Sequence, residues 1–178
     1  MTKAIFDELE VGGDELLKVI SSFSDDQIHI VPFEGSWTAA QVADHLLKAD
    51  TGALKVLYGK TEKTERQADE KVRAIKNMFL DFSLKFKSSE QIMPSNFPQG
   101  KNNLLKDLKV KLTALQEAAE TLDLSAICAE IEVPALGTLT RLEWLYLVCY
   151  HTQRHTCQIQ NIFQNTANYN HHLTQKVS

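Results

Sequence analysis

Two histidines four residues apart, His151 and His155, have the type and spacing of a metal-binding pair. On an α-helix, a spacing of four places two side chains on one face, one turn apart. Two imidazoles in this relation can bind one metal ion. Neutral nitrogen ligands suit Zn, Ni, Cu or Fe better than Mg or Ca. The pair therefore predicts half of a transition-metal site, which needs a third ligand from elsewhere.

The segment 140–162 around this pair is expected to be a helix. It contains no Gly or Pro, and Thr140 and Glu143 have the spacing of a capping box. The histidines interrupt an apolar stripe that should face the core and is formed by Trp144, Val148, Ile159 and Ile162. A buried polar group without a partner costs about 1–3 kcal/mol. A shared metal ion would satisfy both imidazoles at once.

His45 is the candidate third ligand. It belongs to a second expected helix, 37–58, in which Thr38 and Gln41 repeat the capping-box spacing and which ends at Gly59. His45 falls on or beside the inward face of this helix. Three imidazoles leave a coordination position open for water or substrate, the pattern of a catalytic site. The alternative is that these are core histidines bonded to hydroxyls or carbonyls, or residues at the wet end of the bundle.

The cysteines are weaker candidates for ligands. Cys149 and Cys157 each lie two residues from a candidate histidine, about 200° around the helix, and should point away from the ion. They are interpreted as small buried hydrophobic residues. Cys128 precedes the helix in a segment of unclear geometry and stays open as a ligand.

The other histidines are not expected to bind the ion. His29 lies in a loop, and His171 and His172 lie in a polar tail, where a superficial position is favoured.

Several polar residues near the histidines could support the site or line a pocket, although capping or a solvated face is favoured for each: Gln41, Asp44, Glu143, Gln153, Arg154 and Gln158. Asp44, Asp50 and Glu143 are the candidates for a general base. None stands out, so no catalytic residue is assigned.

Hydrophobic periodicity predicts an all-α fold, a four-helix bundle of antiparallel helices with a long loop between the second and third core helices. The expected helices are 3–22, kinked or restarted at Gly12 and Gly13, then 37–58, 70–86, 104–122 and 140–162. The loop 87–103 is rich in Pro, Ser, Asn and Gly and is expected to border a pocket mouth. Residues 1–178 are interpreted as one domain with a polar C-terminal tail from about residue 165.

Composition argues against several classes of protein. A net charge of −4 gives no support for nucleic-acid binding. No apolar run approaches the roughly 20 residues of a membrane span, and the acidic N-terminus is unlike a secretory signal. Three cysteines are too few for a disulfide framework. We expect a cytoplasmic protein without membrane partners, and the apolar face of 104–122 would permit a homodimer.

Two stretches, SWTAAQVADHL at 36–46 and LGTLTRLEWLYLVCYHTQRH at 136–155, resemble the signature regions of the damage-inducible DinB-like superfamily, which includes the YfiT-like metal-dependent proteins. The resemblance implies a four-helix bundle with His45, His151 and His155 as metal ligands. Trp37, Thr38, Glu143, Trp144 and Arg154 match flanking positions without established chemistry. Members include thiol-dependent transferases that use bacillithiol or mycothiol, a mycothiol-dependent isomerase, and proteins with no assigned activity.

The resemblance and the histidines together lead us to expect a divalent-metal-dependent enzyme acting on a small molecule. The ion would be Zn or Ni, and a low-molecular-weight thiol would be the co-substrate of an S-transferase in which a metal-bound thiolate attacks an electrophile. A metal-dependent hydrolase would use the same site. The alternative is a non-catalytic, stress-associated bundle that binds a metal or another ligand.

Overall fold

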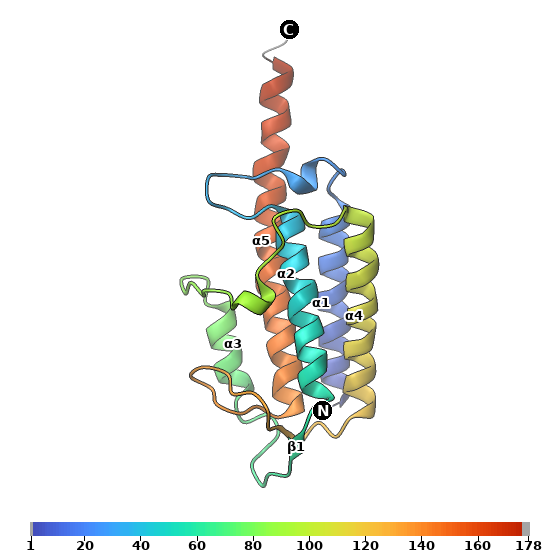
Figure 1. Ribbon diagram of the computed structural model, residues 1–178, viewed down its shortest axis with the longest axis vertical. Helices are drawn as coiled ribbons and strands as arrows, with labels where there is room; N and C mark the ends of the chain where they lie inside the picture. Colours follow the sequence, from blue (N-terminus) through green and yellow to red (C-terminus); the bar gives the residue numbers. More distant parts are fainter. Residues whose placement is uncertain (1, 176–178) are drawn as a thin grey trace.

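Four long helices form a bundle, which confirms the predicted all-α fold. The computed structural model describes residues 2–175, with side chains as far as residue 166. The bundle consists of α1 (Thr2–Ser21), α2 (Ala39–Leu57), α4 (Lys101–Thr121) and α5 (Arg141–Gln175). A shorter helix, α3 (Val72–Leu80), packs on the outside against α5 (Figure 1). No helix of the described part is both long enough and apolar enough to cross a membrane.

The first two helices of the bundle, α1 and α2, lie at opposite corners, and so do the last two, α4 and α5. Both α1 and α2 pack against α4 and α5, so α1 and α2 are diagonal partners. In Figure 1, α1 and α5 run upward, whereas α2 and α4 run downward. Each core helix therefore has one antiparallel and one parallel neighbour, so the predicted antiparallel arrangement holds for only one of the two neighbours of each helix. The chain crosses the top of the bundle through 22–38, which holds the short 3₁₀ helix η1 (Gln27–His29).

The second and third core helices, α2 and α4, are joined by a long connection, residues 58–100, which contains most of the predicted loop 87–103. It contains β1 (Thr61–Glu62), α3 and the 3₁₀ helix η2 (Glu90–Ile92). At the lower end, β1 pairs antiparallel with β2 (Ile127–Cys128), with Thr61 opposite Cys128. Segment 81–100 then climbs back along the bundle to α4 (Figure 1). This return path carries η2 across α2.

The expected break in the first helix is absent. Helix α1 continues through Gly12 and Gly13 without interruption. Gly13 is buried, and a Cβ atom there would lie 3.1 Å from Cδ1 of Leu112 on α4. The missing side chain at this position lets α1 and α4 approach closely, which offsets the low helix propensity of glycine.

Two helix ends differ from the sequence expectation. Helix α3 ends at Leu80 instead of residue 86, because Arg154 binds the backbone carbonyls of Phe79, Asp81 and Leu84 and holds the following residues in a loop. Helix α5 continues past Ile162 to Gln175 and projects beyond the bundle (Figure 1). His171 and His172 lie outside the residues whose side chains are described.

Candidate metal centre

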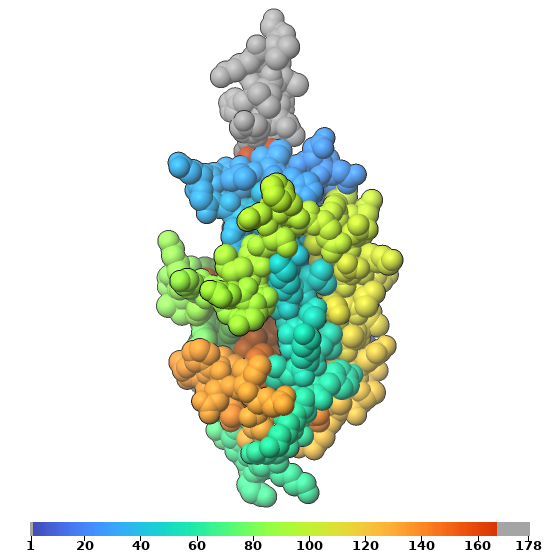
Figure 2. Space-filling view, viewed as in Figure 1, coloured from blue at the N-terminus to red at the C-terminus, as the bar shows by residue number. Residues whose placement is uncertain are grey.

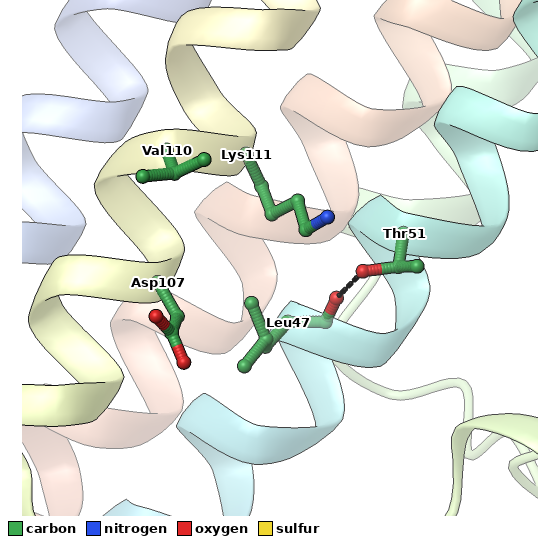
Figure 3. A pocket seen from close by; sticks show the side chains of 5 residues that line it. All are labelled: Leu47, Thr51, Asp107, Val110 and Lys111. Carbon is green, nitrogen blue, oxygen red and sulfur yellow. Dashed lines mark hydrogen bonds between the residues drawn. The ribbon is translucent and has the colours of Figure 1, made fainter.

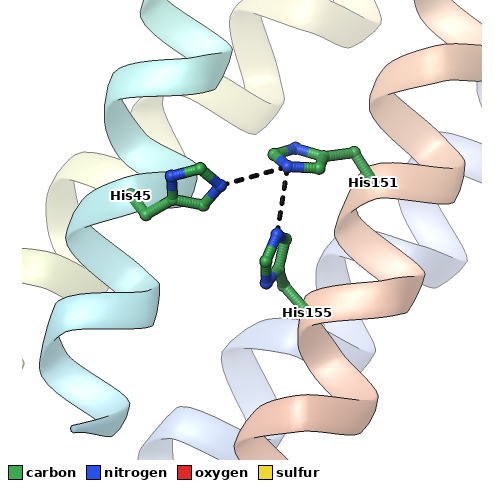
Figure 4. Close-up of side chains that lie close together, drawn as sticks. All are labelled: His45, His151 and His155. Atoms are coloured by element: carbon green, nitrogen blue, oxygen red, sulfur yellow. Dashed lines mark hydrogen bonds between the residues drawn. The ribbon is translucent and has the colours of Figure 1, made fainter. Parts of the chain in front are cut away.

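Three histidine side chains from α2 and α5 meet at the contact between these helices (Figure 4). Nε2 of His151 lies 3.1 Å from Nε2 of His45 and 3.1 Å from Nε2 of His155. The candidate ligand atoms of the three residues all lie within 4.8 Å of one another. Zn–N bonds of about 2.0–2.1 Å in a tetrahedral site separate two nitrogens by about 3.3 Å. The observed spacing is therefore close to that of nitrogens that share one ion.

Hydrogen bonds on the far side of two rings determine which nitrogen is free. Nδ1 of His45 donates to the backbone carbonyl of Ile92 at 2.8 Å, and Nδ1 of His155 donates to Oε1 of Gln158 at 2.8 Å. A neutral imidazole carries only one proton. Nε2 of each ring therefore presents a lone pair toward His151. The Nδ1–H bonded to a carbonyl is the arrangement usually found for metal-bound histidine.

The contacts at His151 Nε2 fit a cation better than they fit hydrogen bonding alone. Both contacts have hydrogen-bond length. If Nε2 of His151 carries a proton, it can donate a linear bond to only one of the two neighbouring lone pairs. If it does not, three lone pairs face one another. An ion among the three nitrogens would satisfy all of them, so the residues present fit a bound metal.

Burial keeps the three imidazoles neutral, as metal ligands must be. Desolvation lowers the pKa of His45, although the hydrogen bond to Ile92 opposes the shift. Desolvation, followed by the neighbouring His155 and His45, lowers the pKa of His151 well below its usual value. The pKa of His155 falls to about 4, mainly through burial and then through His45. All three rings are therefore in the neutral form, with one ring proton each, at neutral pH.

The cluster lies at the edge of the bundle, on the side covered by the long connection, and not at its centre. His45 is only 2% exposed, whereas His151 and His155 are half-buried. The ring centroid of Trp37 lies 5.3 Å from that of His45, and the ring centroid of Phe79 lies 5.8 Å from that of His151. Figure 2 shows a hollow on this face with α5 at its floor, bordered by α2, by the lime-green segment near 85–95 and by the orange loop near 130–138. The cluster thus has apolar walls and remains partly open to solvent.

Both predicted capping boxes are present, and they fix the starts of the helices that carry the histidines. Thr38 and Gln41 exchange hydrogen bonds of 3.1 and 3.0 Å at the start of α2. Thr140 and Glu143 do the same at 2.9 and 3.1 Å at the start of α5. Because the start of each helix is fixed, the rotation of each helix and the direction of its histidines are fixed as well.

Glu143 has a structural role beyond its cap. It is fully buried, and its carboxylate binds both terminal nitrogens of Arg66 at 2.6 and 2.7 Å and the amide of Lys71 at 2.8 Å. Burial alone would raise the pKa of Glu143, but these hydrogen bonds lower it. The residue ties the 61–71 segment to α5 and is not available as a general base.

The other two candidate bases, Asp44 and Asp50, do not bind the histidine rings either. Asp44 accepts a hydrogen bond from the amide of Ser95 at 2.7 Å and pairs with Lys48 at 2.9 Å. Asp50 is 1% exposed, and its Oδ2 atom has no hydrogen-bond partner among the described residues. Burial raises the pKa of Asp50 to about 7, although Lys111 opposes the shift. Neither carboxylate shares a hydrogen bond with the cluster.

The cysteines do not join the three histidines. Within the described residues, these histidines form the only group of three or more His, Cys, Asp and Glu side chains that could hold an ion. Cys149 is buried, as expected, but Cys157 is exposed, so its interpretation as a buried hydrophobic residue is wrong. Cys128, which the sequence left open, is buried in β2, and burial raises the pKa of its thiol to about 11. His29 is exposed in η1.

A second hollow lies between α2 and α4 and has a different character. Leu47, Thr51, Asp107, Val110 and Lys111 line it (Figure 3). The Thr51 hydroxyl is already bonded to the carbonyl of Leu47 at 2.8 Å. This hollow contains no histidine and does not include the candidate metal centre.

The three histidines could be identified from the sequence, and Gln158 was among the residues expected to support them. The backbone carbonyl of Ile92, 47 residues from His45 along the chain, could not be identified in this way. A carbonyl oxygen has no side-chain signature, and only the position of the long connection brings it to His45. The composition of 87–103 was the available signal, since it marked this loop as part of a pocket mouth.

The crystal structure of TT2238, described as a four-helix bundle protein, is similar to this chain with a TM-score of 0.54 and 20% sequence identity. The match covers 90% of this chain and 99% of that chain, and it supports the fold alone. Protein YuaE of Bacillus subtilis (strain 168), described as uncharacterized, is 24% identical over 163 residues, which are 89% of this chain and 95% of YuaE. Residues 8–159 match the DinB superfamily. Since this match spans most of the sequence, the chain belongs to the DinB superfamily.

Proposed function

We propose that this protein is a divalent-transition-metal-dependent enzyme that transfers a low-molecular-weight thiol to an electrophilic small molecule. His45, His151 and His155 would hold the ion. The observation that supports this most strongly is the convergence of three Nε2 atoms, two of them on rings whose Nδ1 atoms already donate hydrogen bonds. Neutral nitrogen donors suit Zn, Ni, Cu and Fe, and among these we propose Zn or Ni.

A bound divalent cation would lower the pKa of a thiol at the open position and so supply a nucleophile at neutral pH. The protein's own residues have simpler tasks. Ile92 and Gln158 keep the protons of His45 and His155 on Nδ1. Trp37 and Phe79 limit access of water beside the rings. The half-buried edges of His151 and His155 leave one side for the substrate to approach.

The reaction forms a bond between the thiol sulfur and the electrophilic atom of the substrate. The leaving group departs with its bonding electron pair, and the thiol proton goes to solvent. A thiol has a pKa of about 8.5, so little help from a general base is needed. Asp44 and Glu143 are bound to other partners, and Asp50 has no hydrogen bond to the cluster. This distribution of carboxylates favours thiol transfer over hydrolysis, which remains the variant for the same site.

Metal analysis and a thiol-transfer assay test this proposal separately. Protein purified without added metal is expected to contain about one equivalent of a divalent transition metal, measured by elemental analysis. The triple variant with alanine at His45, His151 and His155 should contain none, and His29→Ala should match the wild type. Full occupancy in the triple variant would exclude these ligands.

The assay uses metal-loaded protein, a panel of thiols and a generic electrophile such as a haloalkyl amide. His151→Ala is expected to lower the transfer rate to that of the uncatalysed reaction. Equal rates in wild type and His151→Ala would instead support a non-catalytic metal-binding role.

A further inference from the structure

A short piece of the long connection lies along α2 beside the candidate metal centre. This piece, residues 90–95, consists of η2 and the three residues after it, and we call it the strap. Four hydrogen bonds join it to α2. Nζ of Lys48 donates to the carbonyl of Met93 at 2.8 Å and to the Ser95 hydroxyl at 3.0 Å. Asp44 accepts from the amide of Ser95 at 2.7 Å, and His45 donates to Ile92 at 2.8 Å.

Polar contacts, not apolar packing, hold the strap in place. No residue of η2 is buried, and the Met93 side chain is 45% exposed. A segment with few buried apolar atoms is held weakly and opens readily when its hydrogen bonds are removed. Asp44 and Lys48 also pair with each other at 2.9 Å, one helical turn apart, on either side of His45. Lys48 and Asp44 therefore supply three of the four hydrogen bonds that join the strap to α2.

The strap carries the atom that fixes the proton of His45. While Ile92 accepts from Nδ1, the Nε2 atom of His45 is free to act as a ligand. If the strap leaves α2, nothing in the strap keeps the proton on Nδ1. The ring can then carry its proton on Nε2, the nitrogen that faces His151. A proton there must be removed before an ion can bind.

We propose that Lys48 and Asp44 are positioning residues for the metal centre, which act by holding the strap so that Ile92 fixes the His45 tautomer. This proposal rests on the proposed function because it takes the three histidines as a metal site. The contacts of the strap with α2 do not depend on that function. Binding of the strap and binding of the metal should reinforce each other, because linkage between two equilibria is reciprocal. A bound ion should therefore also protect the amide of Ser95 from hydrogen exchange.

Lys48→Met is the decisive variant, because loss of its charge and loss of the strap are expected to change the metal affinity in opposite directions. Loss of a positive charge beside the histidines should strengthen cation binding if electrostatics alone matters. Loss of the strap should weaken it, by about 10-fold or more, as expected when the partner of a metal-bound histidine is lost. Lys55→Met is the matched control, since Lys55 is exposed on the same helix. Asp44→Leu removes the other anchor and should weaken binding in the same direction.

The test measures Zn²⁺ affinity of the full chain by competition with a chromophoric chelator, and the His45 tautomer in metal-free protein by ¹⁵N NMR of the imidazole ring. We expect His45 of the wild type and Lys55→Met to carry its proton on Nδ1. Lys48→Met should show a mixture of tautomers and Zn²⁺ binding weaker by about 10-fold or more. Unchanged or tighter binding, or an unchanged tautomer in Lys48→Met, would overturn the positioning role.

The two proposals can fail independently. If the wild type binds no divalent metal, the proposed function fails, while the tautomer measurement still tests the strap. If the wild type binds Zn²⁺ and Lys48→Met binds it equally well, the function stands and the strap proposal fails. Circular dichroism of each variant checks that the bundle is intact. Should Asp44→Leu fail to fold, the Lys48→Met result alone decides the matter.

Discussion

His155 and Gln158 form a hydrogen-bonded pair within a single turn of α5, with Nδ1 of the imidazole 2.8 Å from Oε1 of the amide. The pair leaves the Nε2 atom of His155 as the nitrogen that faces His151. One helix thus supplies two candidate ligands and the residue that orients one of them. His45 obtains the same support from the backbone of a distant segment.

Gln158→Met should weaken metal binding without changing any ligand. The variant removes the acceptor of His155 Nδ1–H but keeps the length of the side chain, and loss of such a partner typically costs about 10–100-fold in metal affinity. Gln158→Glu keeps an acceptor and should bind the ion at least as tightly as the wild type. Zn²⁺ competition titration measures both, with Gln160→Met as the control. Wild-type affinity in Gln158→Met would show that this hydrogen bond does not contribute.

Arg66→Met should destabilise the fold by about 3–5 kcal/mol, because it leaves the buried carboxylate of Glu143 without its charged partner. The two remaining amide donors, from Thr140 and Lys71, cannot neutralise the charge. Urea unfolding at pH 7 measures the loss. Arg73→Met removes the same charge from an exposed position on α3 and should change the stability by less than about 0.5 kcal/mol. Similar values for the two variants would contradict a buried ion pair.

Asp50 should make the protein less stable as the pH rises from about 4 to about 7. Its pKa is about 7 in the folded protein against 3.8 for the free side chain, so in this range the unfolded chain has released a proton that the folded chain retains. By linkage, stability falls with increasing pH until the folded carboxyl also ionises. Each pKa unit corresponds to about 1.4 kcal/mol, which gives an upper bound of about 4 kcal/mol.

Asp50→Asn removes this titration and keeps the shape of the side chain. Urea unfolding at pH 4.5, 6 and 8 measures the free energy of unfolding of wild type and variant. The difference between the two should change with increasing pH, in the direction that favours the variant at pH 8. Asp7→Asn, at an exposed position on α1, is the control. A stability difference between wild type and Asp50→Asn that does not depend on pH would show that Asp50 ionises normally in the folded protein.

The two adjacent glycines of α1 should respond in opposite ways to the same substitution. A Cβ atom at Gly12 would meet no heavy atom of the described residues within 4 Å, so Gly12→Leu should stabilise the helix by up to about 1 kcal/mol. Gly13 faces Leu112 on α4, and Gly13→Leu should cost about 1–3 kcal/mol through overpacking. Thermal and urea unfolding compare the two variants directly. Equal effects would mean that α1 and α4 can separate without cost.

The sequence was sufficient for the parts of the fold that depend on local chemistry. Capping boxes at Thr38 and Thr140 marked the starts of both histidine-bearing helices, and the structure contains both. The spacing of His151 and His155 required only helix geometry. His45 could be added because it falls near the inward face of a helix with a defined start.

Features that depend on distant contacts could not be predicted. From the sequence alone, Gly13 predicts a break in the helix. Its role in close packing depends on Leu112, which belongs to another helix. The end of α3 at Leu80 depends on Arg154, which binds carbonyls more than 70 residues away in the sequence. The diagonal placement of α1 and α2 leaves no trace in local periodicity. These features follow from packing between helices, which a pattern along one helix does not contain.

His45 lies 106 residues before His151 in the sequence, and both His151 and His155 lie on the last helix. During synthesis, a growing chain presents the first imidazole long before the other two leave the ribosome. No early folding intermediate that lacks α5 can hold an ion in this arrangement. An ion held by all three histidines would therefore have to bind after α5 has been made and has met α2.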